Sequence, residues 1–417
     1  MSGMAVRIPR GTCKLFGAIK ALSSIKKCVV LVHGPKGCVY HINYIMGMRG
    51  DHPSEIYSTC LGEQDVIFGA DQKLKTAIED LDRELHPDLI AVLSCCASDI
   101  IGEDVESAIR DTTTTVPVIG IDAGGFEGDF RTGYSETLTR LVEKFVEKRE
   151  DADPRSVNLI GLLRGGPDLQ ELIRILGLAG IAVNAVLTAD ATLEEIRQLG
   201  RAALNIVLCE PAGKDAAELL HLKCGIPWII EELPIGVDAT RQFLLRITKA
   251  LGLTGIPDIS QERCVVDYPM LKNRRIALVS GPTRAISMTR FFKELGIEPK
   301  LIIVDFNSNI SEKLGSLALT GCEILIEPSQ DLIEQKLREH NIDLLIGGMM
   351  ELPVAKALGI EHIDIMHGSQ RTVGFDGAKN LMHLLSLSKN CGTLRRTPCD
   401  WMVKCARRDC VGAGAPA

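Results

Sequence analysis

One unit recurs along the chain: a short aliphatic segment, a turn with Gly or Pro, and an amphipathic helix. The first aliphatic segments are Cys28–His33, Asp88–Ser94 and Val116–Asp122. Strands that are apolar at nearly every position are buried on both faces, as in a parallel sheet covered by helices. A helix is predicted over Ser135–Lys148, because its apolar side chains fall on one stripe.

A charged linker is predicted over Glu147–Arg155, and the unit then restarts twice. The first restart has a strand over Val157–Leu163 and a helix that ends at Gly177. The second has a strand over Arg275–Ser280 and a helix that ends at Gly296. The buried face of the first of these helices is expected to contain Leu169, Leu172, Ile173 and Leu176. Further strands are predicted over Ala203–Leu208, Leu301–Val304, Glu323–Ile326 and Asp343–Ile346.

These units predict an α/β fold of three Rossmann-like domains, each a parallel sheet flanked by helices. We expect the domains to span residues 1–150, 151–265 and 266–390, with a Cys-containing tail over 391–417. The length of 417 residues agrees with three domains of about 150 residues each.

Charge and composition narrow the function classes. With 47 Lys and Arg against 54 Asp and Glu, the net charge of −7 argues against a nucleic-acid partner. No apolar run reaches the roughly 18 residues that a membrane span needs. Residues 1–11 lack the apolar core of a signal peptide, so we expect a cytoplasmic location. Without a G-x-x-x-x-G-K-S/T motif, and with G-x-G only at Gly412–Gly414, we expect neither ATP hydrolysis nor the usual NAD site.

Fourteen cysteines are the unusual feature of the composition. In a reducing compartment they are candidates for metal binding or redox chemistry rather than disulfides. Cys38 and Cys96 follow the first two long strands, where ligands of open parallel sheets gather, and Cys13 could reach that edge from the N-terminal side. Thiolates there suit an iron–sulfur cluster, which usually takes four ligands. Cys60 offers a fourth position, as does a residue of a facing chain in a dimer.

The remaining cysteines have plainer interpretations. Cys28, Cys264 and Cys322 lie in or near apolar strands and are expected to be packing residues. Cys95 is adjacent to Cys96 and is its alternative. The tail cysteines have no common zinc spacing, so a second metal site is not favoured; they are Cys391, Cys399, Cys405 and Cys410.

Several ordered motifs make the chain resemble the nitrogenase component 1 superfamily. They are Cys13–Ala18, His33–Cys38, Ser58–Ala70, Cys96 with Gly102–Asp104, Gly225–Trp228 and Gly374–Gly377. The resemblance implies three Rossmann-like domains and an iron–sulfur cluster, a 4Fe–4S cluster, held by Cys13, Cys38 and Cys96 at a subunit interface. It also implies an ATP-hydrolysing iron–sulfur partner that supplies electrons, which agrees with the missing nucleotide motifs.

Departures from the family pattern suggest which branch the chain is most similar to. Cys209 matches the cysteine that anchors the large nitrogenase cofactor, but Val373 stands where the family has the anchoring histidine. In length and motifs the chain is most similar to the catalytic component of Ni-sirohydrochlorin a,c-diamide reductive cyclase. That resemblance implies a homodimer that reduces and cyclises a nickel tetrapyrrole during synthesis of coenzyme F-430. The alternatives are a scaffold for assembly of a nitrogenase-type cofactor, a protochlorophyllide-type tetrapyrrole reductase, or a redox-sensing homologue.

A carboxylate-rich tetrapyrrole needs cationic neighbours. Lys36, His41 and Arg49 flank the predicted cysteine loop and are candidates for substrate binding. His367 is a further candidate, as a residue that lines the space where nitrogenase keeps its cofactor. The sequence assigns no catalytic acid or base.

Overall fold

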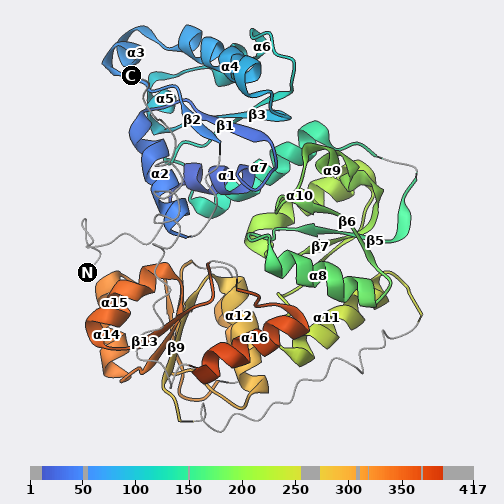
Figure 1. The fold of residues 1–417 in the computed structure, drawn as a ribbon, viewed down its shortest axis with the longest axis vertical. Helices are drawn as coiled ribbons and strands as arrows, with labels where there is room; N and C mark the ends of the chain where they lie inside the picture. Colours follow the sequence, from blue (N-terminus) through green and yellow to red (C-terminus); the bar gives the residue numbers. More distant parts are fainter. Residues whose placement is uncertain are drawn as a thin grey trace, which may run out of the picture.

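The computed structural model describes residues 12–49, 55–148, 151–254, 273–306, 310–317, 319–367 and 370–387. The tail and Cys264 lie outside these residues. Three sheets, all with parallel pairing, follow one another along the described chain, each with helices around it (Figure 1). The α/β fold class predicted from the recurring units is therefore confirmed. The residue boundaries of the three domains stay a prediction.

The first sheet has the strand order β2-β1-β3-β4 and lies at the top of Figure 1. Every strand residue of β1 and β3 is buried, as their apolar sequences predict. The strands are β1 Cys28–Val32, β2 Ile56–Ser58, β3 Leu89–Leu93 and β4 Val118–Ile121. The helices are α1 Lys14–Leu22, α2 Lys36–Met48, α3 Glu63–Phe68, α4 Asp71–Leu85, α5 Cys96–Ile101, α6 Val105–Arg110 and α7 Phe130–Phe145.

The second sheet has the order β6-β5-β7-β8. Its strands are β5 Asp153–Ile160, β6 Ala182–Leu187, β7 Ala202–Val207 and β8 Trp228–Ile230. Its helices are α8 Pro167–Leu178, α9 Leu193–Arg197, the 3-10 turn η1 Gln198–Arg201, α10 Glu210–Cys224 and α11 Val237–Ala250.

The third sheet has the order β11-β10-β9-β12-β13. Its strands are β9 Ile276–Ser280, β10 Leu301–Val304, β11 Glu323–Ile326, β12 Leu344–Gly347 and β13 Glu361–Asp364. Its helices are α12 Pro282–Glu294, α13 Ile310–Gly315, α14 Gln330–Glu339, the 3-10 turn η3 Met349–Glu351, α15 Leu352–Leu358 and α16 Gly374–Leu387.

Three sequence predictions need correction. Helix α7 starts at Phe130 rather than Ser135, because the Asp129 carboxylate caps it by accepting the backbone N–H groups of Arg131 and Thr132. Strand β5 starts at Asp153, inside the predicted linker. Helix α8 continues through Gly177, and its Ile173 is 45% exposed. The buried face of α8 is rotated toward Asp168, Glu171 and Ile175, since α8 packs against α16.

The hydrophobic cores do not stop at the sheet boundaries. Helix α7 packs against both α1 and α10, and one buried cluster joins Leu138 and Val142 of α7 with Ala217 and Leu220 of α10. A second cluster joins the second and third sheets, where α8 meets α16. The three sheets are therefore packed as one continuous structure. None of the described helices has the length and apolar character to cross a bilayer.

Candidate functional site

The structure brings Cys13 and Cys96 to the same loop. Cys13 precedes α1, and its backbone pairs with Asp129 in an isolated bridge. Cys96 begins α5, and its Sγ accepts the backbone N–H of Gly125 at 3.2 Å. A Cβ on Gly125 would lie 3.3 Å from Cys96 Sγ and 3.4 Å from Cys13 Cβ. The two cysteines therefore flank one glycine whose missing side chain gives them room.

Close packing of α1 on α7 fixes the position of Cys13. A Cβ on Gly17 would lie 1.9 Å from the carbonyl oxygen of Phe130, and one on Gly133 would lie 1.9 Å from that of Lys14. Only glycine allows such contact between two helix backbones. The backbone N–H of Phe130 also donates to the carbonyl of Thr12 at 3.1 Å. The sequence motif contained Gly17, but it gave no sign that this glycine positions Cys13.

Cys38 lies in the first turn of α2 and is half-buried. Burial raises the pKa of its thiol, and the neighbouring Cys95, Cys13 and Cys96 raise it further. The structure places Cys13 and Cys96 beside Gly125 and Cys38 in the first turn of α2, after β1. That these three cysteines together bind one cluster stays a prediction.

Cys95 and Cys60 differ from these three. The Cys95 sulfur is buried, lies 3.4 Å from the carbonyl oxygen of His33, and fills the space that a Cβ on Gly34 would need. It faces the core, whereas Cys96 faces outward. Cys60 is exposed, with a φ of 52°. Its backbone is held by Ser58 and by Lys73, whose Nζ donates to the Cys60 carbonyl at 3.0 Å.

The donor set of Cys13, Cys38 and Cys96 fits an iron–sulfur cluster. Two of the thiols are exposed and the third is half-buried, and glycines next to the loops leave space beside the sulfurs. The Gly125 N–H directed at Cys96 is the kind of hydrogen bond that tunes a cluster potential. Among the described residues, no three His, Cys, Asp or Glu side chains are arranged to hold a single metal ion.

Three of the predicted substrate-binding residues belong to α2 and its C-terminal cap, and the fourth follows β13. Lys36 and His41 are exposed on α2, while the Arg49 guanidinium lies over the Phe16 ring, 5.1 Å from its centroid. His367 follows β13, and its Nδ1 lies 3.2 Å from both the Met349 amide nitrogen and Asp364 Oδ2. Arg49 and His367 therefore have structural partners, and Lys36 and His41 have surface positions.

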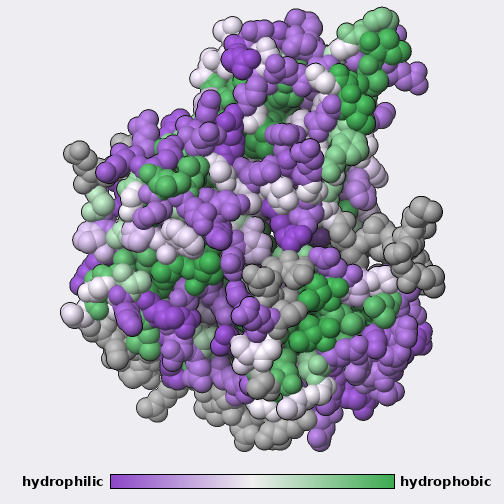
Figure 2. Space-filling view, turned by 180° about the vertical axis from the view of Figure 1, so that it is seen from behind, coloured by the Kyte–Doolittle hydropathy of each residue, from purple (hydrophilic) through white to green (hydrophobic). Residues whose placement is uncertain are grey.

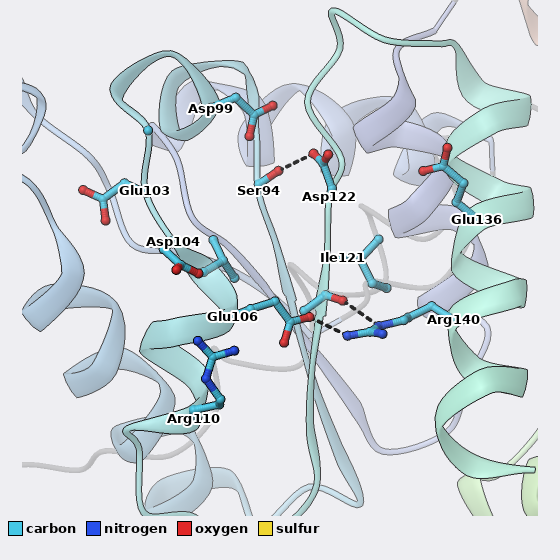
Figure 3. A pocket seen from close by; sticks show the side chains of 13 residues that line it. Ser94, Asp99, Glu103, Asp104, Glu106, Arg110, Ile121, Asp122, Glu136 and Arg140 are labelled. Carbon is cyan, nitrogen blue, oxygen red and sulfur yellow. Dashed lines mark hydrogen bonds and ion pairs between the residues drawn. The ribbon is translucent and has the colours of Figure 1, made fainter.

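A pocket of about 970 Å³ opens at the carboxyl ends of β3 and β4. Figure 3 shows carboxylates around it, with Ser94 donating to Asp122 at 3.0 Å and Arg140 paired with Glu106. Glu103 lines its edge. Burial raises the pKa of Asp99, and the nearby Asp122 adds to the shift.

A second site lies where the second and third sheets meet. Cys209 precedes α10 and is buried, and Thr283 Oγ1 of α12 donates to its Sγ at 3.4 Å. Burial raises the pKa of the Cys209 thiol. Lys313 of α13 also reaches across to Glu210, with a distance of 2.9 Å between Nζ and Oε2. Cys209 therefore belongs to a buried hydrophobic cluster and also contacts α12 of the third sheet.

Two arginines and one aspartate lie along this contact. The Asp168 side chain is 1% exposed and accepts Arg164 Nη2 at 2.8 Å, while Arg284 Nη2 is 3.6 Å away. Desolvation lowers the pKa of Arg284 to about 10. The carboxylates of Asp168 and Asp364 both oppose this shift, so the buried guanidinium has acidic partners from both sheets. Sequence reasoning missed Arg164 and Arg284, although both follow strands that end at a Gly turn.

Exposed apolar side chains mark two surfaces near the cysteines. The α3 patch consists of Val66, Ile67, Phe68 and, on the adjoining α5, Ile100; Phe68 is 84% exposed. Figure 2 shows hydrophobic surface at the protruding tip that α3 forms. The α2 stripe consists of Tyr40, Tyr44 and Met48, which recur at helical spacing on one face. Exposed apolar patches of this kind mark protein contacts.

Comparison with known families decides the broad identity. The profile of the nitrogenase component 1 type oxidoreductases matches residues 13–386. The chain belongs to this family. It is 31% identical over 405 residues to the nitrogenase iron–molybdenum cofactor biosynthesis protein NifE of Clostridium pasteurianum, covering 92% of this chain and 88% of that protein. It is 25% identical over 433 residues to the nitrogenase molybdenum–iron protein beta chain of Methanococcus maripaludis, covering 91% and 93%.

A solved structure of the nitrogenase component Cp1 at pH 6.5 has the same fold, with a TM-score of 0.83 at 22% identity, covering 94% of this chain and 96% of that one. Proteins of the nitrogenase component 1 family bind iron–sulfur clusters and work with an ATP-dependent iron protein. The family resemblance read from the cysteine motifs is thus confirmed. The narrower assignment to an F-430 cyclase is not among these findings and stays a prediction.

Proposed function

We propose that this nitrogenase component 1 family member is a scaffold subunit on which a nitrogenase-type iron–sulfur cofactor is assembled. One observation carries the proposal: a buried cysteine, Cys209, lies where the second and third sheets meet, and Thr283 of α12 donates to its sulfur. A cysteine at such a contact can bind a cluster precursor through its sulfur, where elements of both sheets surround it. The similarity to a cofactor biosynthesis protein supports the same assignment.

In this proposal Cys13, Cys38 and Cys96 hold a resident 4Fe–4S cluster, which supplies one-electron transfer. The chain's own contribution is to orient those thiols through Gly125 and the α1–α7 contact. The α3 patch is where we place the ATP-hydrolysing iron–sulfur partner. The fourth cluster ligand comes from a second copy of the chain that packs against the α2 stripe, or from Cys60. The location we propose is cytoplasmic.

The anchor of the precursor is a single cysteine. Val373 is fully buried in the core beside α16, so no side chain in its place could act as a second ligand without displacing that packing. A single protein ligand suits a precursor that is later transferred to another protein, whereas a nitrogenase active site has to retain its cofactor.

The test is anaerobic loading of the purified chain with iron, sulfide and a cluster-assembly protein. Wild type is expected to bind iron at both sites, Cys209→Ala to lose the iron of the second site, and Cys38→Ala to lose that of the first. Cys224→Ala, at the other end of α10, is the matched control for Cys209→Ala and is expected to retain all iron. Equal iron content in wild type and Cys209→Ala would refute the scaffold assignment.

The second candidate is the reductive cyclase for Ni-sirohydrochlorin a,c-diamide, in synthesis of coenzyme F-430. The burial of Val373 favours the cyclase. The large cofactor of nitrogenase would lack one of its two anchoring side chains in this protein, so the space that it occupies in nitrogenase could take another ligand. Another tetrapyrrole reductase, of the protochlorophyllide type, shares this argument. Mixing the chain with an iron protein, ATP, dithionite and the nickel tetrapyrrole decides it: a changed absorbance spectrum supports the cyclase, and an unchanged one with a reducible cluster refutes it.

A further inference from the structure

Access to Cys209 is closed in this structure. The residue is only 7% exposed, so a group as large as a cluster precursor reaches its sulfur only if a covering element moves. The first and second sheets cover it with a buried cluster that includes Ile160 and Ala212. A Cβ on Gly161 would lie 3.1 Å from the Cys209 carbonyl oxygen, so the backbones are in close contact there. The third sheet adds Thr283 of α12, whose hydroxyl donates to Cys209 Sγ at 3.4 Å.

The contact of α8 with α16 fastens the third sheet to the second through buried charged groups. The Asp168 carboxylate of α8 is 1% exposed and accepts the backbone N–H of Thr372 at 2.6 Å. The Glu171 carboxylate of the same helix is also 1% exposed and accepts the backbone N–H of Asp376 at 3.1 Å. Separating buried charged groups from their partners is costly. We therefore expect the α8–α16 contact to stay closed.

The contacts made by α13 and by the residues after β10 are more exposed. Lys313 of α13 pairs with Glu210 of α10 at 2.9 Å, and their side chains are 41% and 35% exposed. The Arg131 guanidinium of α7 lies over the ring of Phe306, 4.8 Å from its centroid, and the Arg131 side chain is 31% exposed. Exposed ion pairs and exposed cation–π contacts each add little stability. This side of the third sheet is therefore the one that can open.

A series of contacts connects Arg131 with the sulfur of Cys209. The Phe306 ring lies beside Gly281, where a Cβ would be 3.7 Å from the ring Cε1 atom. Gly281 is the N-cap residue of α12, and Thr283 follows it in the first turn of that helix. Because Phe306 packs against the turn that begins α12, the position of its ring is linked to that of the Thr283 hydroxyl over Cys209.

The other end of this series lies beside the first cysteine site. The Nε of Arg131 donates to Asp129 Oδ2 at 2.9 Å, and its backbone N–H donates to Asp129 Oδ1 at 2.9 Å. The backbone of Asp129 pairs with that of Cys13. The loop beside Cys13 therefore orients the guanidinium that lies over Phe306.

We propose that the third sheet opens on its α13 side to admit a cluster precursor to Cys209, and that the Arg131–Phe306 contact holds it closed. This inference rests on the proposed function, in which Cys209 receives that precursor. Opening separates α13 from α10 and withdraws Thr283 from the sulfur, while the α8–α16 contact serves as the hinge. The residue that holds the third sheet closed is thus positioned by the loop beside Cys13.

The test is labelling of the reduced full chain, without any cluster, by iodoacetamide, with each cysteine followed by mass spectrometry. Wild-type Cys209 reacts only while its cover is open. Phe306→Ala removes the ring and is expected to raise the labelling rate of Cys209 about two- to fivefold, as loss of an exposed cation–π contact predicts. Cys224 is buried in the same cluster, at the other end of α10, and is expected to keep its rate, because a local opening leaves it covered.

The controls separate local opening from general loss of structure. Phe306→Tyr keeps a ring under the guanidinium and is expected to keep the wild-type rate. Phe126→Ala, which removes an exposed ring from the loop before α7, is also expected to change nothing. If Phe306→Ala does not fold, Arg131→Gln decides, since it removes the cation from the same contact. An unchanged Cys209 rate in the deciding variant, or an equal rise at Cys224, would overturn the inference.

The labelling experiment and the iron-loading experiment can fail separately. Labelling is measured on the chain without iron, so its result does not depend on whether Cys209 binds a cluster. Full iron content in Cys209→Ala would refute the scaffold assignment and leave the opening of the third sheet in place. Unchanged labelling together with loss of iron in Cys209→Ala would keep the scaffold and refute the role of Arg131 and Phe306.

Discussion

Replacing Asp168 by asparagine tests the contact that joins the second and third sheets. The Asp168 carboxylate accepts the backbone N–H of Thr372 at 2.6 Å and its hydroxyl at 2.9 Å, and it compensates Arg164 and Arg284. The asparagine amide keeps the shape and one acceptor oxygen but removes the buried carboxylate that faces Arg164 and Arg284. Breaking a buried ion pair by removing one partner costs about 3–5 kcal/mol.

The lower end of that range applies, because asparagine retains the acceptor for the Thr372 N–H. For a cooperative unit of about 150–250 residues, each kcal/mol lowers Tm by roughly 2–4 °C, so a loss of about 3 kcal/mol lowers it by roughly 6–12 °C. Calorimetry of the full chain measures this shift. Hydrogen exchange should rise at Thr372 and Val373, whose amides face Asp168.

Asp238→Asn is the matched control, because its pair with Arg241 lies on the surface of α11 and an exposed pair contributes about 0–1 kcal/mol. A Tm shift for Asp168→Asn no larger than that of Asp238→Asn would show that the buried charges do not hold the two sheets together.

Three further predictions concern the cysteines and the partner surface. Gly125→Ala puts a Cβ 3.3 Å from Cys96 Sγ, so bound iron should fall while the circular dichroism spectrum stays unchanged; Gly37→Ala, which meets open space, should retain its iron. Phe68→Asp should slow reduction by the iron protein at least tenfold and leave reduction by dithionite unaffected, whereas Leu222→Asp, on another exposed surface, should change neither rate. Cys209 should react with iodoacetamide at pH 8 more slowly than exposed Cys60, because burial covers its sulfur and raises its pKa; mass spectrometry would contradict this by finding equal labelling.

The sequence predicted the strands better than the helix ends. Continuous apolar runs such as Leu89–Leu93 can only be buried strands here, and their carboxyl ends located Cys38 and Cys96. The start of α7 depended on a side-chain cap at Asp129, and the exposure of Ile173 depended on where α16 packs. Both are tertiary facts that a periodic pattern does not contain.

Some residues of the candidate site could also be predicted from the sequence, and others could not. Residue types and strand ends pointed to Cys13, Cys38 and Cys96 as the proposed cluster ligands. The glycine contact that positions Cys13, the Arg164–Asp168–Arg284 group and the Arg131–Phe306 contact all join segments far apart in the sequence. Such pairings need coordinates, since nothing in the local sequence says which distant partner a buried charge will meet.

The packing of α7 between α1 and α10 has a consequence for the order of events during synthesis. Cys13, Cys38 and Cys96 leave the ribosome before α10, which ends at Cys224. At about 5–20 residues per second, translation from Cys96 to the end of α10 takes roughly 6–25 seconds. During that interval α7 lacks α10, although α1, whose contact with α7 positions Cys13, has already been made. A nascent chain halted before α10 therefore already carries all three thiols, which the cell has to keep reduced until iron arrives.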